Sequence, residues 1–423
     1  MKACFFSLLI VFSGLAEARS YYIDPSAINK DPKGNITDPW KSFEPLYEIM
    51  ASLKPGDSIL LKRGEIFFQK LNLECSGKAS APIVITGYGP GNSKPIFMYK
   101  KIGNGASADQ EYAVRMYKSQ YIMLEGLEVT DNQTDLLIHN SNALIKIAFS
   151  IDESNFITIQ NCVISLVGIG VNLVGNNNVV NKCSVKNLRM VRNTNDGGHD
   201  DYGANAVVLA GENNVISDCS FSDCWATSFD FEFDGGAVEM AGPACNGNRI
   251  INNAVTNCNG FMEFGSTEAG TVANNYISKN TVLNCGDLLY INNDGPYTVE
   301  VKNLRLIDNI FIQTFPQRTK SGSMITMSKT SPDKQIIFLQ DNIFWLPMKI
   351  DVTRSGQFDN GQLNHTYNTY YLCGGNLNFD LHPSEKILDP TSKIFNKLLE
   401  RSNFTSVDLY PFKFLLKYWY LMF

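Results

Sequence analysis

A short motif that recurs through the middle of the chain constrains its fold more than any other feature. Each copy is a β-prone run in which Asn, Asp or, once, Lys stands just before a small or apolar residue. The residues after that polar position are Cys162, Cys183, Cys219, Ala254, Thr281, Ile310 and Ile343. Subtracting neighbouring positions gives steps of 21, 36, 35, 27, 29 and 33 residues. Such steps are too short for βαβ units and are typical of a solenoid built from short strands and turns.

Residues at equivalent positions stack from coil to coil in a solenoid. We therefore predict an inward ladder of Cys162, Cys183 and Cys219, and a second ladder in which Cys285 lies above Cys258. Cysteines buried in this way are expected to be reduced thiols. The Asn and Asp column just before the first ladder is expected to lie in turns, where side-chain amides satisfy backbone groups.

The two ends of the chain extend this interpretation. Apolar residues at helical spacing predict a helix over Ser42 to Leu53, followed by the run Gly56-Asp-Ser-Ile-Leu-Leu-Lys-Arg-Gly. With the Asn-Cys coils and Asp389-Pro-Thr-Ser-Lys-Ile-Phe-Asn near the end, residues 21 to 416 resemble the right-handed parallel β-helix proteins of the pectin-lyase-like superfamily. The resemblance implies an all-β fold, a right-handed parallel β-helix of about ten coils with a short N-terminal capping helix. It also implies a secreted enzyme acting on polysaccharides, although the superfamily includes adhesins and phage tailspikes.

Domain boundaries follow from composition. Lys2, the apolar run from Ala3 to Ala16 and the small residues around Glu17 are typical of a secretory signal cleaved after Ala18. We expect residues 1–18 to be a signal peptide, 19–416 the β-helix domain and 417–423 a divergent C-terminal tail, in a secreted or periplasmic protein. No later apolar run reaches the ~20 residues of a membrane span. A net charge of −6 without a long basic run disfavours nucleic acid as a partner. We expect a monomer whose partner is a polysaccharide, acidic or neutral.

Two glutamates at matching positions of consecutive coils are the main functional signal. Glu239 and Glu263 each lie between apolar residues, so both point outward if their neighbours point inward. Alignment of the flanking coils puts Val208 below Glu239 and Tyr290 above Glu263. Adjacent rungs are roughly 4.8 Å apart, and like charges placed opposite each other are destabilising. Such a pair therefore serves catalysis, binds a metal, or occurs by accident.

Glycoside hydrolysis is the chemistry that we favour for this pair. It requires one protonated and one ionised carboxyl group, and repulsion between stacked carboxylates would keep one of them protonated. Further acids concentrate in the longer coils nearby. We predict as catalytic residues Glu239, Glu263, Asp234 and Asp201, and as substrate-binding residues Tyr290, His199, Asp200 and Trp225. A pair formed by Asp234 or Asp201 with one of the glutamates, which would invert configuration, is equally open. Hydrolysis of this kind requires no cofactor.

Two other functions stay open at this point. A calcium-dependent lyase or epimerase of uronic-acid polymers would hold Ca²⁺ on the oxygens of Asp201, Asp234, Glu239 and Glu263. The base that takes the C5 proton would then be Lys279, Arg249 or His199. A non-catalytic, glycan-binding or adhesive β-helix would present the same acids as a solvated face. The sequence patterns of polygalacturonases, pectin methylesterases and the main pectate lyases are absent, so no subfamily is indicated.

Overall fold

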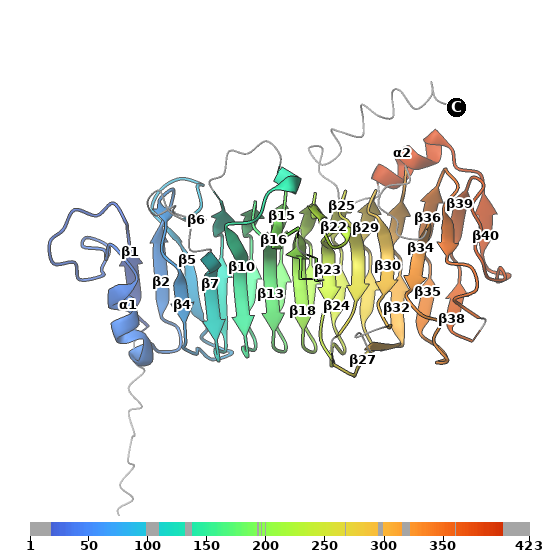
Figure 1. The fold of residues 1–423 in the computed structure, drawn as a ribbon. Coiled ribbons are helices and arrows are strands. Elements are labelled where there is room, and N and C mark those ends of the chain that lie inside the picture. Colours follow the sequence, from blue (N-terminus) through green and yellow to red (C-terminus); the bar gives the residue numbers. More distant parts are fainter. Residues whose placement is uncertain are drawn as a thin grey trace, which may run out of the picture.

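The computed structural model describes residues 18–98, 110–131, 138–192, 194–195, 197–198, 200–266, 268–294, 299–314, 322–359 and 361–400. Their strands form three long sheets of 12, 10 and 12 strands, in which all the paired strands are parallel (Figure 1). Along the chain, β11, β12 and β13 belong to the first, third and second sheets in turn, and the coils that follow repeat this order. This is the predicted right-handed parallel β-helix.

The first sheet contains β1 (Ser20–Ile23), β2 (Ser58–Lys62), β5 (Ile83–Tyr88), β8 (Ile122–Glu125), β11 (Thr158–Gln160), β14 (Val179–Asn181), β19 (Val215–Ser217), β24 (Arg249–Ile251), β28 (Tyr276–Ser278), β32 (Leu304–Ile307), β35 (Ile337–Gln340) and β38 (Leu363–Thr366). The second, which we call the site sheet, contains β4 (Leu71–Leu73), β7 (Gln110–Tyr117), β10 (Ile145–Asp152), β13 (Ile169–Val174), β18 (Asn205–Ala210), β23 (Gly236–Met240), β26 (Gly260–Phe264), β30 (Asp287–Ile291), β34 (Ser323–Met327) and β37 (Asp351–Thr353).

The third sheet contains β3 (Ile66–Phe67), β6 (Ile96–Met98), β9 (Glu128–Thr130), β12 (Val163–Ser165), β15 (Ser184–Lys186), β20 (Ser220–Ser222), β25 (Ala254–Thr256), β29 (Thr281–Leu283), β33 (Ile310–Ile312), β36 (Ile343–Leu346), β39 (Thr369–Leu372) and β40 (Lys386–Leu388). Three small pairs are β16 (Met190–Arg192) with β17 (Tyr202–Gly203), β21 (Ala226–Ser228) with β22 (Glu232–Asp234), and β27 (Gly270–Ala273) with β31 (Val299–Lys302).

Short helices lie near both ends of the described stack. The helix predicted over 42–53 is observed as α1 (Glu44–Ile49) and the 3₁₀ turn η1 (Met50–Ser52), at the N-terminal end in Figure 1. Phe43, just before α1, stacks on Phe67 and Phe97 at centroid distances of 5.7 and 6.1 Å. A second 3₁₀ turn is η2 (Ile138–Asn140), and α2 (Ser392–Glu400) lies near the C-terminal end. Within the described part of the chain, no helix is long and apolar enough to cross a bilayer.

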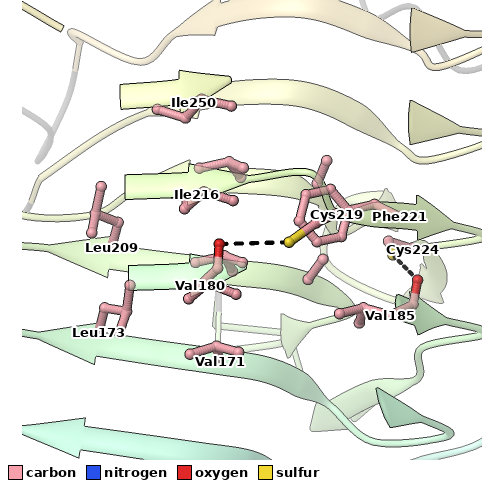
Figure 2. Packing of buried hydrophobic residues seen from close by; sticks show 14 of the residues in the cluster. Val171, Leu173, Val180, Val185, Leu209, Ile216, Cys219, Phe221, Cys224 and Ile250 are labelled. Atoms are coloured by element: carbon pink, nitrogen blue, oxygen red, sulfur yellow. Dashed lines mark hydrogen bonds between the residues drawn. The ribbon is translucent and has the colours of Figure 1, made fainter. Parts of the chain in front are cut away.

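The core runs through the middle of the stack and is lined by inward-facing aliphatic, aromatic and cysteine side chains (Figure 2). Cys162, Cys183 and Cys219 are buried in one column, as predicted. Their thiols face backbone carbonyls; Cys219 Sγ lies 3.6 Å from the Val180 oxygen. Burial raises the pKa of the Cys162 thiol well above its ordinary value, which makes it unreactive. The second predicted ladder, Cys258 and Cys285, also includes Cys224.

The predicted alignment of the coils is wrong by one residue after Cys219. Ser220 pairs with Ala254, so Cys219 stacks on Asn253 and the step there is 34 residues rather than 35. The motif places every Asn in a turn, and Asn161, Lys182 and Asp218 do have the left-handed turn conformation, with φ of 54°, 51° and 55°. Asn253, however, points inward. The cysteine column therefore continues as an asparagine column.

That column is a buried hydrogen-bonded ladder of Asn253, Asn280, Asn309, Asn342 and Asn368. The backbone N–H of each Asn donates to the side-chain Oδ1 of the next, at 2.9 Å from Asn253 to Asn280 and 3.0 Å from Asn280 to Asn309. Each amide Nδ2 donates to a backbone carbonyl of the preceding coil, for example Asn280 to Ile250 at 2.9 Å. The ladder thus satisfies buried polar groups at one corner of these five coils.

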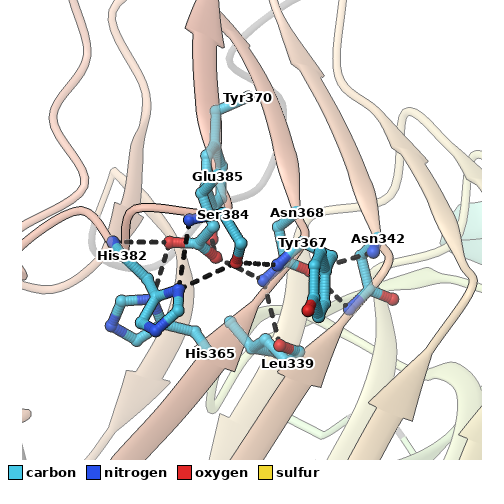
Figure 3. Close-up of polar contacts among 9 residues, drawn as sticks. All are labelled: Leu339, Asn342, His365, Tyr367, Asn368, Tyr370, His382, Ser384 and Glu385. Carbon is cyan, nitrogen blue, oxygen red and sulfur yellow. Dashed lines mark hydrogen bonds and ion pairs between the residues drawn. The ribbon is translucent and has the colours of Figure 1, made fainter.

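Glu385 ends this ladder at the C-terminal side (Figure 3). Its carboxylate accepts hydrogen bonds from Asn368 Nδ2 at 2.6 Å and from the Tyr370 hydroxyl at 3.0 Å, and it pairs with His365 Nδ1 at 2.7 Å. Burial raises the pKa of this carboxyl group. The hydrogen bonds from His365, Asn368 and the His382 backbone outweigh that effect, so its pKa lies below the ordinary value.

A depressed carboxyl pKa makes folding stability depend on pH. Glu385 should stabilise the fold above its unfolded-state pKa, and this stabilisation should be lost as the pH falls through its folded-state pKa. We expect Glu385→Gln to lower the free energy of unfolding at pH 7 by about 1–3 kcal/mol and to reduce its fall between pH 6 and pH 3. Denaturant titrations at several pH values measure both. The matched control is Glu300→Gln, since that glutamate is exposed beside Lys302; equal pH profiles for Glu385→Gln and the native chain would contradict the assignment.

Candidate active site

The register of the site sheet confirms the predicted column of outward residues. Glu239 in β23 is paired with Glu263 in β26, Val208 in β18 lies on the other side of Glu239, and Tyr290 in β30 follows Glu263. Both glutamates are partly exposed, whereas Met240 after the first of them is buried. The inward apolar residues fix this register, because a shift by one would turn them toward solvent.

A second column, three residues earlier in each strand, creates a hollow beside the glutamates. In register across the sheet it contains Asn205, Gly236, Gly260 and Asp287. The two glycines have no side chains, and a Cβ on Gly236 would lie 3.3 Å from the Gly260 carbonyl oxygen. The hollow lies over these glycines, and its lining includes Glu239, Glu263, Asp287 and Tyr290. Its free volume is about 20 Å³, which is room for about one water molecule.

Asp287 is a site residue that the sequence interpretation missed. Strict alternation would place it on the face opposite to Tyr290, three residues later. In β30, however, both intervening residues, Leu288 and Leu289, are buried. Alternation is therefore broken at the start of these strands, and Asp287 lines the hollow although only 5% of its surface is exposed. The alignment of Asp287 with Gly260 of the preceding coil was the signal in the sequence that could have identified it.

Asn205 is a second residue that was not predicted. It is buried at the near edge of the hollow, and its Nδ2 donates a hydrogen bond to Glu239 Oε2. A hydrogen bond to a carboxylate oxygen favours the ionised form of that group. The outer strand neighbours of the two glutamates also differ, since Val208 flanks Glu239 and Tyr290 flanks Glu263.

Asp201, predicted as catalytic, has a different place. It is 4% exposed and does not line the hollow. Its carboxylate accepts hydrogen bonds from the Thr194 N–H at 2.9 Å, the Ser228 hydroxyl at 2.8 Å and the Phe229 N–H at 2.8 Å. Burial raises the pKa of Asp201, but these bonds outweigh it and leave the pKa below its ordinary value. Asp201 thus anchors the turn of the β21–β22 hairpin as an ionised group.

Asp234 and Asp200 lie around this hairpin. Asp234 ends β22, and its Oδ1 accepts the N–H of Gly235 at 2.7 Å, a residue that lines the hollow. Asp234 itself is outside the lining of the hollow, and its hydrogen bond can position Gly235. The Asp200 N–H donates to Asp230 Oδ2 at 2.8 Å.

The calcium set predicted from the sequence is not assembled as one cluster. Among the described residues, the group of acids whose oxygens all lie within 4.8 Å of one another is Asp200, Asp201 and Asp230. Asp201 in that group already accepts backbone and hydroxyl hydrogens, and Asp230 Oδ2 accepts two N–H groups. These oxygens are therefore occupied by protein donors, and the group does not fit a calcium site formed with Glu239 and Glu263.

Trp225, predicted to bind substrate, packs at the base of the hairpin instead. Its ring stacks on His139 at 3.8 Å with an interplanar angle of 13°, and Phe233 meets it edge-on at 5.8 Å. Its place is fixed by η2, 86 residues earlier in the chain, a contact that no local pattern reveals. His199 lies outside the described residues. The basic candidates for a lyase, Arg249 and Lys279, belong to β24 and to the turn after β28, in the first sheet rather than the site sheet.

The hairpin gives a prediction about Asp201. Asp201→Ala removes the acceptor of several buried donors, so we expect it to lower the free energy of unfolding by about 2–4 kcal/mol and to expose residues 226–234 to proteases. Thermal melts and limited proteolysis with mapped cleavage sites measure these effects. Glu232→Gln, in the same hairpin but exposed, serves as the control. Unchanged proteolysis of Asp201→Ala would show that the carboxylate does not hold this turn.

In sequence, this chain is similar to known proteins over only part of its length. No family model matches the chain. The chain is 30% identical over 137 residues to a lacto-N-biosidase of Bifidobacterium longum, a match that spans 28% of this chain and 8% of that protein. The chain therefore corresponds to only a small part of this curated relative.

Solved structures share the fold at low identity. One is XylC in complex with xylose, with a TM-score of 0.53 and 9% identity over 87% of this chain and 86% of that chain. Another is the tailspike of E. coli bacteriophage HK620 in complex with a pentasaccharide, with a TM-score of 0.51 and 11% identity over 79% of this chain and 60% of the tailspike. These likenesses establish the parallel β-helix fold.

Proposed function

We propose that this chain is a glycoside hydrolase acting on an oligosaccharide or polysaccharide, with the hollow on the site sheet as its active site. The observation that carries the proposal is the pairing of Glu239 with Glu263 on adjacent strands beside a glycine-floored hollow that Asp287 and Tyr290 also line. Two neighbouring carboxyl groups on an accessible surface are what glycosidic bond cleavage requires.

The surroundings of the two glutamates suggest their roles. Asn205 favours an ionised Glu239, which suits a nucleophile, and we assign the general acid to Glu263, the carboxyl group paired with it across the sheet. Glu263 would protonate the glycosidic oxygen as the Glu239 carboxylate attacks the anomeric carbon and forms a glycosyl ester. Glu263, now ionised, would take a proton from the water that hydrolyses this ester. Directly paired strands lie about 4.8 Å apart, close to the ~5–5.5 Å carboxyl separation of retaining enzymes, so we propose retention of configuration.

Asp287 and Tyr290 would position the sugar. Tyr290 offers an apolar ring face with a polar tip next to Glu263, a surface on which a pyranose ring can stack. Asp287, at the far edge of the glycine floor, can accept a hydrogen bond from a sugar hydroxyl group. No step in this scheme uses a metal or another cofactor.

Similarity to other proteins supports this choice. The curated relative is named a lacto-N-biosidase, which supports a glycan as the substrate. XylC and the tailspike have this fold and were solved with xylose and a pentasaccharide, which supports a glycan as the ligand. A secreted protein, as the first 18 residues predict, would meet such glycans outside the cell.

A substrate screen tests the proposal. Neutral and acidic oligosaccharides and polysaccharides are incubated with the chain, with and without a chelator, and both new reducing ends and unsaturated uronides are measured. We expect new reducing ends without unsaturated product, unchanged by the chelator. Unsaturated, chelator-sensitive product would favour the lyase, and saturable binding without any product would favour a glycan-binding protein.

A further inference from the structure

A second hollow lies on the same face of the site sheet, near its N-terminal end. It measures about 340 Å³ and is lined by three tyrosines, Tyr47, Tyr112 and Tyr117, together with Arg115 and Asn72. This volume falls within the range of small-molecule sites. Aromatic rings with a few polar groups are the usual surroundings of a bound sugar ring, because each ring combines an apolar face with hydrogen-bonding atoms beside it.

The register aligns this second hollow with the proposed active site. Arg115 in β7 is followed across the sheet by Ser150, Asn172, Val208 and then Glu239, all in one column. Four strand spacings of about 4.8 Å separate Arg115 from Glu239, or roughly 19 Å. Tyr112 belongs in the same way to the column of Asn205 and Gly236. A glycan that runs across the strands can therefore contact both hollows, whereas a disaccharide is too short.

Side chains in this second hollow are held in place before any ligand binds. Arg115 Nε donates to Asp152 Oδ2 at 2.5 Å, and Ser150 Oγ donates to the other oxygen of that carboxylate at 3.0 Å. The guanidinium carbon of Arg115 then lies 4.9 Å from the ring centroid of Tyr117 and 5.5 Å from that of Tyr112. A site ordered in advance loses less conformational entropy on binding.

The charges around this hollow favour a neutral ligand. Arg115 is paired with Asp152, and Lys118 Nζ lies 3.8 Å from Glu153. Glu74 also lines the hollow, and Lys70 Nζ lies 5.0 Å from the ring centroid of Tyr112. Cations and acids thus balance, and an anionic sugar would gain little net attraction.

We propose that the hollow lined by Tyr112, Arg115 and Tyr117 is a distal subsite for a neutral sugar unit of the substrate glycan. This inference rests on the proposed function and specifies its substrate: a neutral glycan of at least about five units extended along the helix axis. The site binds through contacts with the tyrosine rings and hydrogen bonds from Arg115 and Asn72. It takes no part in bond cleavage.

Binding to a printed array of neutral and acidic oligosaccharides, two to ten units long, tests the subsite. The Glu263→Gln variant is the probe, so that glycans are not consumed. We expect binding to neutral glycans of five or more units. Tyr117→Ala or Asn72→Ala should weaken this binding about three- to tenfold and should leave the affinity for shorter glycans unchanged. Asn72 is exposed, so its substitution leaves the fold intact. Tyr276→Ala is the matched control, because Arg249 lies over that ring in the first sheet at 5.8 Å.

Several outcomes would overturn the subsite. The Glu263→Gln probe could bind no glycan, or it could bind acidic glycans alone. It could also bind long neutral glycans with the same affinity whether or not it carries Tyr117→Ala. Assays of cleavage by the native chain separate this inference from the proposed function. If long neutral glycans are cleaved with the same KM by the native chain and by Tyr117→Ala, the distal subsite fails while the hydrolase stands. If binding depends on Tyr117 but nothing is cleaved, the subsite stands and the hydrolase fails.

Discussion

Glu239→Gln and Glu263→Gln should each lower kcat by about 10²–10⁴-fold on the substrate that the screen identifies. Both substitutions keep the size of the side chain and its exposure while removing the carboxylate, so the β23–β26 pairing and the melting temperature should be preserved. Glu128→Gln, on an equally partly exposed glutamate of β9 in the third sheet, should leave kcat unchanged. Full activity of both site variants would exclude the hollow as the active site.

The two glutamates should differ in their responses. If Glu239 is the nucleophile, adding azide to Glu239→Gly should restore turnover and give a glycosyl azide of inverted configuration, because the small anion replaces the missing carboxylate. If Glu263 is the general acid, Glu263→Gln should lose least activity on substrates whose leaving group needs no protonation, such as nitrophenyl glycosides. An inverted glycosyl azide formed by Glu263→Gly, with a retained one from Glu239→Gly, would reverse the assignment.

A substitution at Asp287 tests whether this residue positions the sugar or takes part in bond cleavage. A group that holds a sugar hydroxyl contributes to binding in the ground state as well as in the transition state, so Asp287→Asn should raise KM more than it lowers kcat. A loss of kcat as large as that of the two glutamate variants would place Asp287 among the reacting groups. The catalytic pair would then consist of Asp287 and one glutamate. Because Asp287 lies three positions before the glutamate column along β30, the two carboxyl groups would be farther apart, which favours inversion over retention.

The glutamate column could be predicted because it depends on local apolar pattern alone. Val238, Met240, Met262 and Phe264 are buried, and in a parallel sheet this fixes both the register and the outward direction of Glu239 and Glu263. The same argument gave Val208 and Tyr290 their places. The coil order and the cysteine column follow from the repeat, since stacked coils must bury equivalent positions together.

The rest of the site depends on features that no local pattern contains. Asp201 looked like a catalytic acid because it precedes a site-sheet strand, yet its oxygens are saturated by donors from the β21–β22 hairpin. Trp225 looked like a sugar platform because it is aromatic, and a histidine far away in sequence fixes it elsewhere. Asp287 was hidden by a local break in alternation. The errors on Asp201 and Trp225 concern side chains whose partners come from another coil or loop.

The asparagine ladder was misplaced for a related reason, and it supplies the prediction with the largest effect on stability. Asn280 is fully buried, with 0% of its surface exposed. Its Oδ1 accepts from the backbone N–H of Asn253 at 2.9 Å and from Asn253 Nδ2 at 3.0 Å. Its Nδ2 donates to the Ile250 carbonyl at 2.9 Å and to Asn309 Oδ1 at 2.9 Å. One side chain therefore satisfies groups of three neighbouring coils.

Asn280→Ala should lower the free energy of unfolding by about 3–6 kcal/mol, because it leaves two or three buried polar groups without their partners, each worth about 1–3 kcal/mol. Asn364→Ala, at an exposed position of β38, should change it by less than about 0.5 kcal/mol. Equilibrium denaturation measures both. In a solenoid each coil is stabilised by its neighbours, so the loss can also appear as an earlier transition for the coils around β29 while the rest stays folded. A change below about 1 kcal/mol, with a single unaltered transition, would mean that water replaces the side chain and that the ladder directs the register of the coils rather than stabilising them.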